Sequence, residues 1–76
     1  MITSAQCRMA RAALNWSTKD LATRANVGLS TVNRFETEAR SPIPATLAAI
    51  QRALEAAGVE FLDGGGVRLK DPVSPP

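Results

Sequence analysis

The sequence of 76 residues contains no histidine, and Cys7 is its single cysteine. These absences exclude disulfide frameworks, zinc fingers and every catalytic triad that needs an imidazole base. No apolar run approaches the roughly 18 residues needed to span a bilayer, and the first residues lack a basic segment followed by an apolar one. We therefore expect a soluble, cytoplasmic protein that is not an enzyme, holds no cofactor or metal and has no membrane partner.

The net charge is only +2, but it is unevenly distributed along the chain. Residues 1–52 carry seven Lys and Arg against three acids, which gives +4, whereas residues 53–76 carry two against four, which gives −2. A basic segment of this kind is expected to meet a polyanion. The length allows one domain with a modest core, so we also expect a second copy of the chain to help stabilise it.

Cap signals divide residues 1–38 into three short helices. Two capping boxes are each followed by an asparagine that suits the left-handed residue ending a helix. These signals are Thr3 with Gln6 and then Asn15, followed by Ser17 with Asp20 and then Asn26. The third helix is predicted to begin near Gly28 and to reach about Glu38, with Val32 and Phe35 on its inner face.

Proline and glycine define the rest of the chain. Pro42 ends the preceding segment, and Pro44 suits the first turn of a fourth helix that stops at Gly58. Residues 59–62 (VEFL) and 67–70 (VRLK) alternate around DGGG, which predicts a β-hairpin. The sequence thus predicts a mainly α domain over residues 1–58, a C-terminal hairpin over 59–70 that serves dimerisation, and a disordered, proline-rich tail over 71–76.

Two short helices joined by a turn of about three residues have helix-turn-helix geometry, in which the second helix enters the major groove. The stretch LATRANVGLSTVNRFE, residues 21–36, resembles the LAxxAGVSxxTVSRxE pattern of the XRE or Cro/cI-like helix-turn-helix family. The similarity extends to LNWS before this stretch and TLAAIQRAL after it, over roughly residues 5–57. Asn26 replaces the turn glycine and Gly28 the cap serine. The resemblance implies a four-helix lambda repressor-like DNA-binding fold.

The resemblance also implies a set of base-reading positions on the third helix. Arg34 has the planar fork that pairs with guanine, and Asn33 suits adenine. Leu29 has two open interpretations, a contact with a thymine methyl or a staple against the preceding turn. The complete set is Leu29, Ser30, Thr31, Asn33 and Arg34.

Phosphate contacts are expected from Thr18 at the start of the second helix, and from Arg40 and Ser41 in the loop after the third. Lys19 and Arg24 are expected to contribute only to the electrostatic field.

Other residues are interpreted as structural. In the family, an Arg late in the first helix pairs with the Glu that ends the recognition helix, which implies a partly buried pair between Arg11 and Glu36. Trp16 is interpreted as a plug for the core, and Cys7 as a small buried hydrophobe.

An isolated two-stranded ribbon is marginal in water, so the hairpin must pack on the helices or pair with another chain. We predict a homodimer in which strands of two copies form a shared sheet, with Phe61, Val67 and Leu69 on its apolar side. The alternative is a hairpin folded over the bundle of a monomer.

Two functional hypotheses follow. The first is a sequence-specific transcriptional regulator, a repressor in particular, that binds double-stranded DNA as a homodimer at an inverted repeat. The second is a protein-interaction module, such as the antitoxin of a toxin–antitoxin pair, in which DNA binding is secondary. The basic residues 1–52 and Arg34 favour DNA, whereas Leu29 and the acidic C-terminal part leave room for a protein partner.

Overall fold

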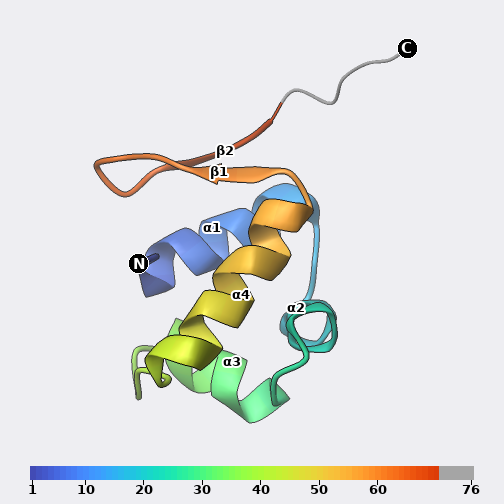
Figure 1. Ribbon diagram of the computed structural model, residues 1–76, viewed down its shortest axis with the longest axis vertical. Coiled ribbons are helices and arrows are strands. Elements are labelled where there is room, and N and C mark those ends of the chain that lie inside the picture. The colour runs from blue at the N-terminus through green and yellow to red at the C-terminus, as the bar shows by residue number, and fades with distance from the viewer. Residues whose placement is uncertain (71–76) are drawn as a thin grey trace.

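The computed structural model describes residues 1–70, which form four helices and two short strands. In chain order these are α1 (Ser4–Leu14), α2 (Thr18–Ala25), α3 (Leu29–Glu36), α4 (Pro44–Ala56), β1 (Val59–Phe61) and β2 (Val67–Leu69). The hairpin lies across one end of the helical bundle, and α3 lies at the other end (Figure 1). The predicted mainly α fold with a C-terminal hairpin is confirmed, while the tail predicted over 71–76 lies outside the described residues.

The predicted capping boxes begin both α1 and α2. Thr3 Oγ1 accepts the Gln6 N–H at 3.0 Å, and Gln6 Oε1 accepts the Thr3 N–H at 2.9 Å. Ser17 and Asp20 form the same reciprocal pair at 3.0 and 2.9 Å. The Ser17 N–H lowers the pKa of the Asp20 carboxyl because it binds the ionised form. Each box satisfies two backbone donors that the helix leaves free.

The helix ends follow the backbone conformation of single residues. Asn15 and Asn26 adopt left-handed φ values of 59° and 57°, as predicted for the ends of α1 and α2. α3, however, ends at Glu36 and does not reach Glu38. Thr37 Oγ1 turns back to donate to the Asn33 carbonyl at 2.9 Å, and Glu38 has a φ of 62°, which no α-helix contains.

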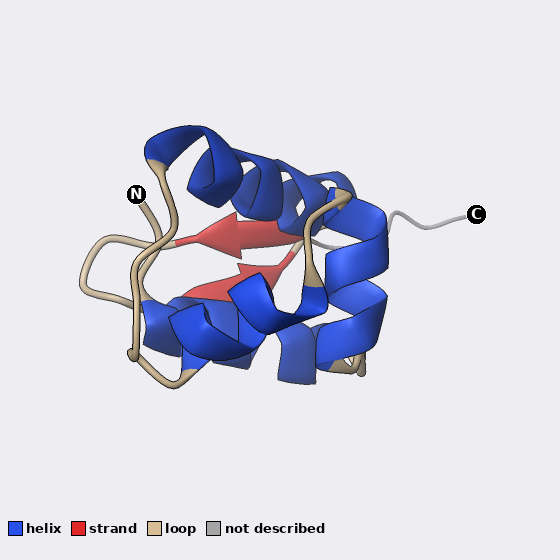
Figure 2. Ribbon diagram, turned by 90° about the horizontal axis from the view of Figure 1, so that it is seen from below, coloured by secondary structure: helices blue, strands red, loops and turns tan. Residues whose placement is uncertain are grey.

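The core lies where all six elements meet. Its largest fully buried side chains are Leu21, Ile50, Leu54, Val32, Val59 and Cys7, which come from α2, α4, α3, β1 and α1. Seen from below, the hairpin closes the far end of the bundle (Figure 2). None of the helices within residues 1–70 combines the length and apolar character that a membrane span requires.

The hairpin packs on the bundle through one face. Its antiparallel register is Val59–Leu69, Glu60–Arg68 and Phe61–Val67. Side chains alternate along a strand, so Phe61 and Val67 turn toward the core, against which both pack. The Gln6 side-chain amide donates to the carbonyls of Leu62 and Gly66 at 3.4 and 3.2 Å, which fastens the turn of the hairpin to α1.

Candidate nucleic-acid interface

Residues 26–28 connect α2 and α3. Asn26 reverses the chain in the left-handed region, and the Val27 N–H donates back to the Ala22 carbonyl at 3.0 Å. Gly28 is the N-cap of α3, and its carbonyl accepts from the N–H groups of Thr31 and Val32 at 3.1 and 3.2 Å. This geometry lets one short helix stop and the next begin in a new direction.

α3 divides its side chains between the core and the solvent. Val32, Phe35 and Glu36 are buried. Of the predicted base-reading residues, Leu29, Ser30, Asn33 and Arg34 are exposed and Thr31 is half-buried. Leu29 is 44% exposed, so part of its surface faces solvent beside these polar side chains.

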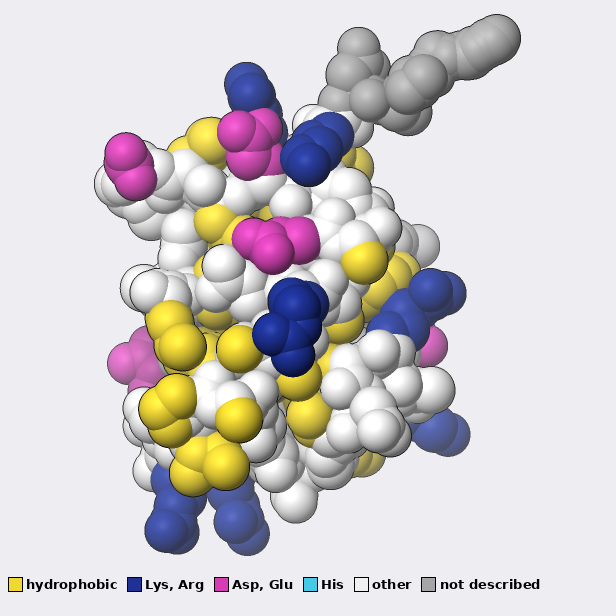
Figure 3. Space-filling view, viewed as in Figure 1, with side chains coloured by type: hydrophobic (Ala, Val, Ile, Leu, Met, Phe, Trp, Pro, Cys, Tyr) yellow, Lys and Arg dark blue, Asp and Glu magenta, His cyan; other side chains and the backbone are white. Residues whose placement is uncertain are grey.

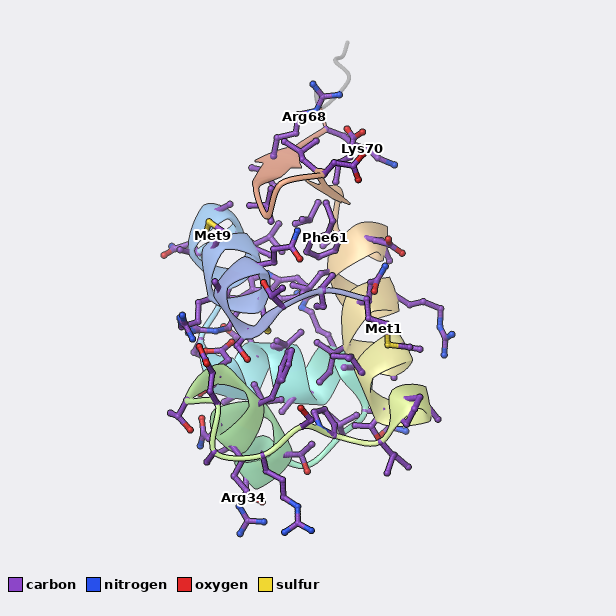
Figure 4. All side chains as sticks on the ribbon, turned by 90° about the vertical axis from the view of Figure 1, so that its left-hand side faces the viewer. Met1, Met9, Arg34, Phe61, Arg68 and Lys70 are labelled. Carbon is purple, nitrogen blue, oxygen red and sulfur yellow. The ribbon has the colours of Figure 1, made fainter. Side chains whose placement is uncertain are left out.

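A hollow of about 260 Å³ lies between α3 and the loop that leads to α4. It brings Arg34 and Thr31 together with Arg40 and Ser41, the residues predicted to contact phosphate; Pro42, Ile43 and Thr46 complete its lining. Arg34 points away from the bundle, at the opposite end of the molecule from Arg68 and Lys70 (Figure 4). Lys or Arg side chains project from this end, below a cluster of hydrophobic side chains (Figure 3).

Two further threonines lie near the start of a helix in this part of the chain. Thr18, predicted to contact phosphate, opens α2 and does not line the hollow. Thr46 does line it but was not predicted, although Pro44 marks the start of α4 and so places Thr46 in the first helical turn. The Ile43 N-cap makes no side-chain hydrogen bond, so the first turn of α4 keeps backbone N–H groups free for an anion.

Arg11 and Glu36, the residues predicted to pair, join α1 to the end of α3. Arg11 Nε lies 2.7 Å from Glu36 Oε2, and Arg11 Nη2 lies 2.7 Å from Oε1, which makes the pair bidentate. The third nitrogen, Nη1, donates to the Trp16 carbonyl at 3.0 Å. The hydrogen bond to Glu36 raises the pKa of Arg11, and the Glu36 side chain is only 5% exposed.

Cys7 has a role beyond that of the small hydrophobe expected from the sequence. Its side chain is fully buried, and the thiol donates to Glu36 Oε2 at 3.2 Å. Burial raises the pKa of the thiol well above its usual range, and the neighbouring Glu36 carboxylate raises it further. The thiol therefore stays protonated as a donor. Cys7 and Arg11 are four residues apart on a helix, a spacing that indicates a shared face.

Trp16 and Arg24 also interact. Trp16 is half-buried against the core, and the Arg24 Cζ atom lies 4.6 Å from the centre of its ring. This distance is that of a cation–π interaction. Arg24 therefore helps to cover Trp16.

The fold and the exposed polar face of α3 define a DNA-binding domain. The family model described as Helix-turn-helix matches residues 8–61, which is well over half of the chain. The chain therefore belongs to the helix-turn-helix family of XRE or lambda repressor-like regulators, as its sequence pattern predicted. No curated protein matches it significantly. Within residues 1–70, no group of three or more His, Cys, Asp or Glu side chains is placed to hold a metal ion.

Proposed function

We propose that the protein is a sequence-specific transcriptional repressor that binds double-stranded DNA as a homodimer, with α3 of each copy in the major groove of one half of an inverted repeat. This proposal rests on the way in which α3 divides its side chains between the core and the solvent. One side of the helix is fixed in the core, and the other presents Asn33 and Arg34, of which Arg34 lines the hollow together with Arg40. Side chains that can read base edges and side chains that can hold phosphate thus share one end of the molecule.

Each exposed residue of α3 has a chemical role in this proposal. Arg34 donates both arms of its fork to O6 and N7 of a guanine, and the Asn33 amide pairs with an adenine. Leu29 meets a thymine methyl, and Ser30 and Thr31 bind either a base or a phosphate. Arg40 and Ser41 hold the phosphate backbone next to α3, and Thr18 contacts it at the start of α2.

Within residues 1–70, the outer edge of β2 pairs with no other strand, which supports the dimer. The Leu62 N–H donates to the Gly66 carbonyl, and the Lys70 N–H donates to the Gly58 carbonyl. Every second residue pair of an antiparallel ladder is hydrogen-bonded, so Glu60 and Arg68 form the hydrogen-bonded pair between these two. The backbone groups of the intervening residues Val67 and Leu69 therefore point away from β1. A second copy of β2 would satisfy them.

The position of the sheet fits a two-site operator. Antiparallel pairing of two β2 edges is generated by a two-fold axis perpendicular to the sheet. Both helical bundles therefore lie on the same face of the shared sheet. The apolar face that carries Phe61, Val67 and Leu69 then continues over both copies. Because α3 lies at the end opposite the sheet, the two α3 helices face the same way (Figure 1). This suits half-sites about 34 Å apart on one side of the duplex.

A protein partner is the second candidate function. Ile43 is 67% exposed and Leu29 is 44% exposed, and both lie at the α3 end of the molecule. Exposed apolar side chains beside the polar ones would suit a partner protein, as in the antitoxin of a toxin–antitoxin pair.

Selection from random double-stranded DNA distinguishes the two functions. We expect the full chain to enrich an inverted repeat, with an affinity that falls steeply as salt rises because bound counterions are released. The matched control carries alanine at Ser30, Asn33 and Arg34 on the same fold and should enrich no sequence. Failure of the native chain to enrich any sequence at low salt would favour the protein-interaction module.

A further inference from the structure

One face of α1 donates hydrogen bonds to the last turn of α3. Ser4 Oγ donates to the Phe35 carbonyl at 2.6 Å, and Arg8 Nη1 donates to the Glu36 carbonyl. On the same face of α1, Cys7 and Arg11 donate to the Glu36 carboxylate as described above. These four donors lie at i, i+3, i+4 and i+7, the spacing of a single helical stripe.

The main-chain contacts solve a problem that every helix has at its end. The last four carbonyls of a helix have no donor within the helix. In α3, the Asn33 and Arg34 carbonyls accept N–H groups from Thr37 and Ala39 at 3.0 and 2.9 Å. The Phe35 carbonyl accepts the Glu38 N–H at 3.0 Å and the Ser4 hydroxyl as well, and the Glu36 carbonyl accepts the Arg8 side chain. α1 therefore holds the backbone of α3 as well as its buried carboxylate.

We infer that Ser4 and Arg8 are positioning residues that fix the tilt of α3 for base recognition, an inference that rests on the proposed DNA-binding function. α3 is only eight residues long, so a small tilt at its end displaces the side chains that read bases. The side chains of a binding site must be held within about 0.5 Å and 10–20° of the geometry in which they bind. Hydrogen bonds to backbone carbonyls are directional, whereas the apolar contacts of Val32 and Phe35 are not.

The two side chains contribute little apolar contact to the fold. Arg8 is exposed and Ser4 is half-buried. Arg8 also places a positive charge at the negative end of the α3 dipole. Removing either side chain therefore removes its donor and little apolar contact, which lets recognition be measured on a folded chain.

The competing explanation for Arg8 is a direct phosphate contact. That role would weaken binding to every duplex alike and would reduce the slope of log affinity against log salt by about one. A positioning role would instead weaken binding to the selected site, since only base contacts depend on the orientation of α3. Ser4 carries no charge and tests the same idea without this ambiguity.

The test compares the affinities of the full chain for the duplex enriched by selection and for a scrambled duplex, at a temperature where circular dichroism shows every variant folded. We expect Ser4→Ala and Arg8→Met each to lower the ratio of the two affinities by about three- to tenfold, the equivalent of one hydrogen bond. Affinity for the scrambled duplex and the salt slope should stay the same. Ser4→Thr keeps the hydroxyl and should restore the ratio, and Arg52→Met on the exposed face of α4 is the matched loss of charge.

Three results would overturn the inference. An unchanged ratio in Ser4→Ala would show that the hydroxyl does not position α3. A parallel loss on both duplexes with a flatter salt slope in Arg8→Met would identify Arg8 as a phosphate ligand. If the native chain itself prefers no duplex, the proposed function fails and the inference fails with it. If the native chain prefers the selected duplex and the variants keep that preference, only the inference fails.

Discussion

The two ends of the molecule each contain an ion pair, and the surroundings of the two pairs differ. At the α3 end, the Arg11 and Glu36 side chains are 21% and 5% exposed and meet through two contacts of 2.7 Å. At the hairpin end, the Arg68 and Glu60 side chains are 65% and 40% exposed and meet through one contact of 2.8 Å. The first pair joins two helices, whereas the second lies in solvent across neighbouring strands. The same chemistry thus has a structural role at one end only.

This difference extends to the backbone groups at each end. The last turn of α3 has its carbonyls satisfied by α1 side chains and by the following loop. The outer edge of β2 has its backbone groups directed away from β1. We therefore propose that the α3 end is a fixed surface for reading DNA, and that the hairpin end is open for pairing with a second copy.

The largest effect is expected from breaking the buried pair. Arg11→Met leaves the Glu36 carboxylate buried without its counter-ion, which should lower the free energy of unfolding by about 3 kcal/mol or more. Arg68→Met removes the same kind of side chain from an exposed pair and should cost less than about 1 kcal/mol. Urea denaturation followed by circular dichroism measures both values.

A small domain has little stability to lose, so the single variant Arg11→Met risks unfolding altogether. The double variant Arg11→Met with Glu36→Leu removes both charges and should recover most of the loss, because it leaves no buried charge unpaired. Equal costs for Arg11→Met and Arg68→Met would show that the two ends do not differ in this way.

The elements that the sequence predicted well are those determined by local chemistry. The boxes at Thr3 and Ser17 fix where α1 and α2 begin, and the asparagines at 15 and 26 fix where they end. All of these interactions span four residues or fewer, so the pattern of residue types is enough to find them. The predicted end of α3 is too late because Glu38 adopts a left-handed φ of 62°, a backbone conformation that the helix propensity of these residues does not indicate.

Contacts between distant segments were harder to predict. The Arg11–Glu36 pair was expected only because the family resemblance implied it. The hydrogen bonds that Ser4, Cys7 and Arg8 donate depend on how α1 crosses α3. Each donor is separated from its acceptor on α3 by 28 to 31 residues. Nothing in local periodicity sets that crossing. The stripe along α1 shows that these residues share a face, but not which element the face meets.

The second-largest effect separates DNA reading from assembly. Arg34→Ala should lose about 1 to 3 kcal/mol of discrimination at one base position of the enriched site, and Arg34→Lys should restore little because an ammonium lacks the planar fork. Quantitative binding to every single-base variant of the site measures the change. The molar mass of the protein in solution should not change, because Arg34 lies at the end opposite the hairpin (Figure 4). Uniform weakening at all positions would instead make Arg34 a phosphate contact.

The smallest effect tests the hairpin end in the same way. Proline is tolerated on edge strands, and the Leu69 N–H points away from β1, so Leu69→Pro should leave the hairpin intact while it removes a donor from the free edge. We expect the dissociation constant of the dimer, measured by sedimentation equilibrium, to rise about tenfold because two-fold symmetry doubles each lost hydrogen bond. Leu69→Ala controls for the loss of the side chain, which is 46% exposed, and should have a weaker effect. Base preference at a single half-site should be the same in both variants, since the change lies far from α3. If both variants dimerise as the native chain does, the second copy binds elsewhere, and the two ends of the molecule do not divide reading from assembly.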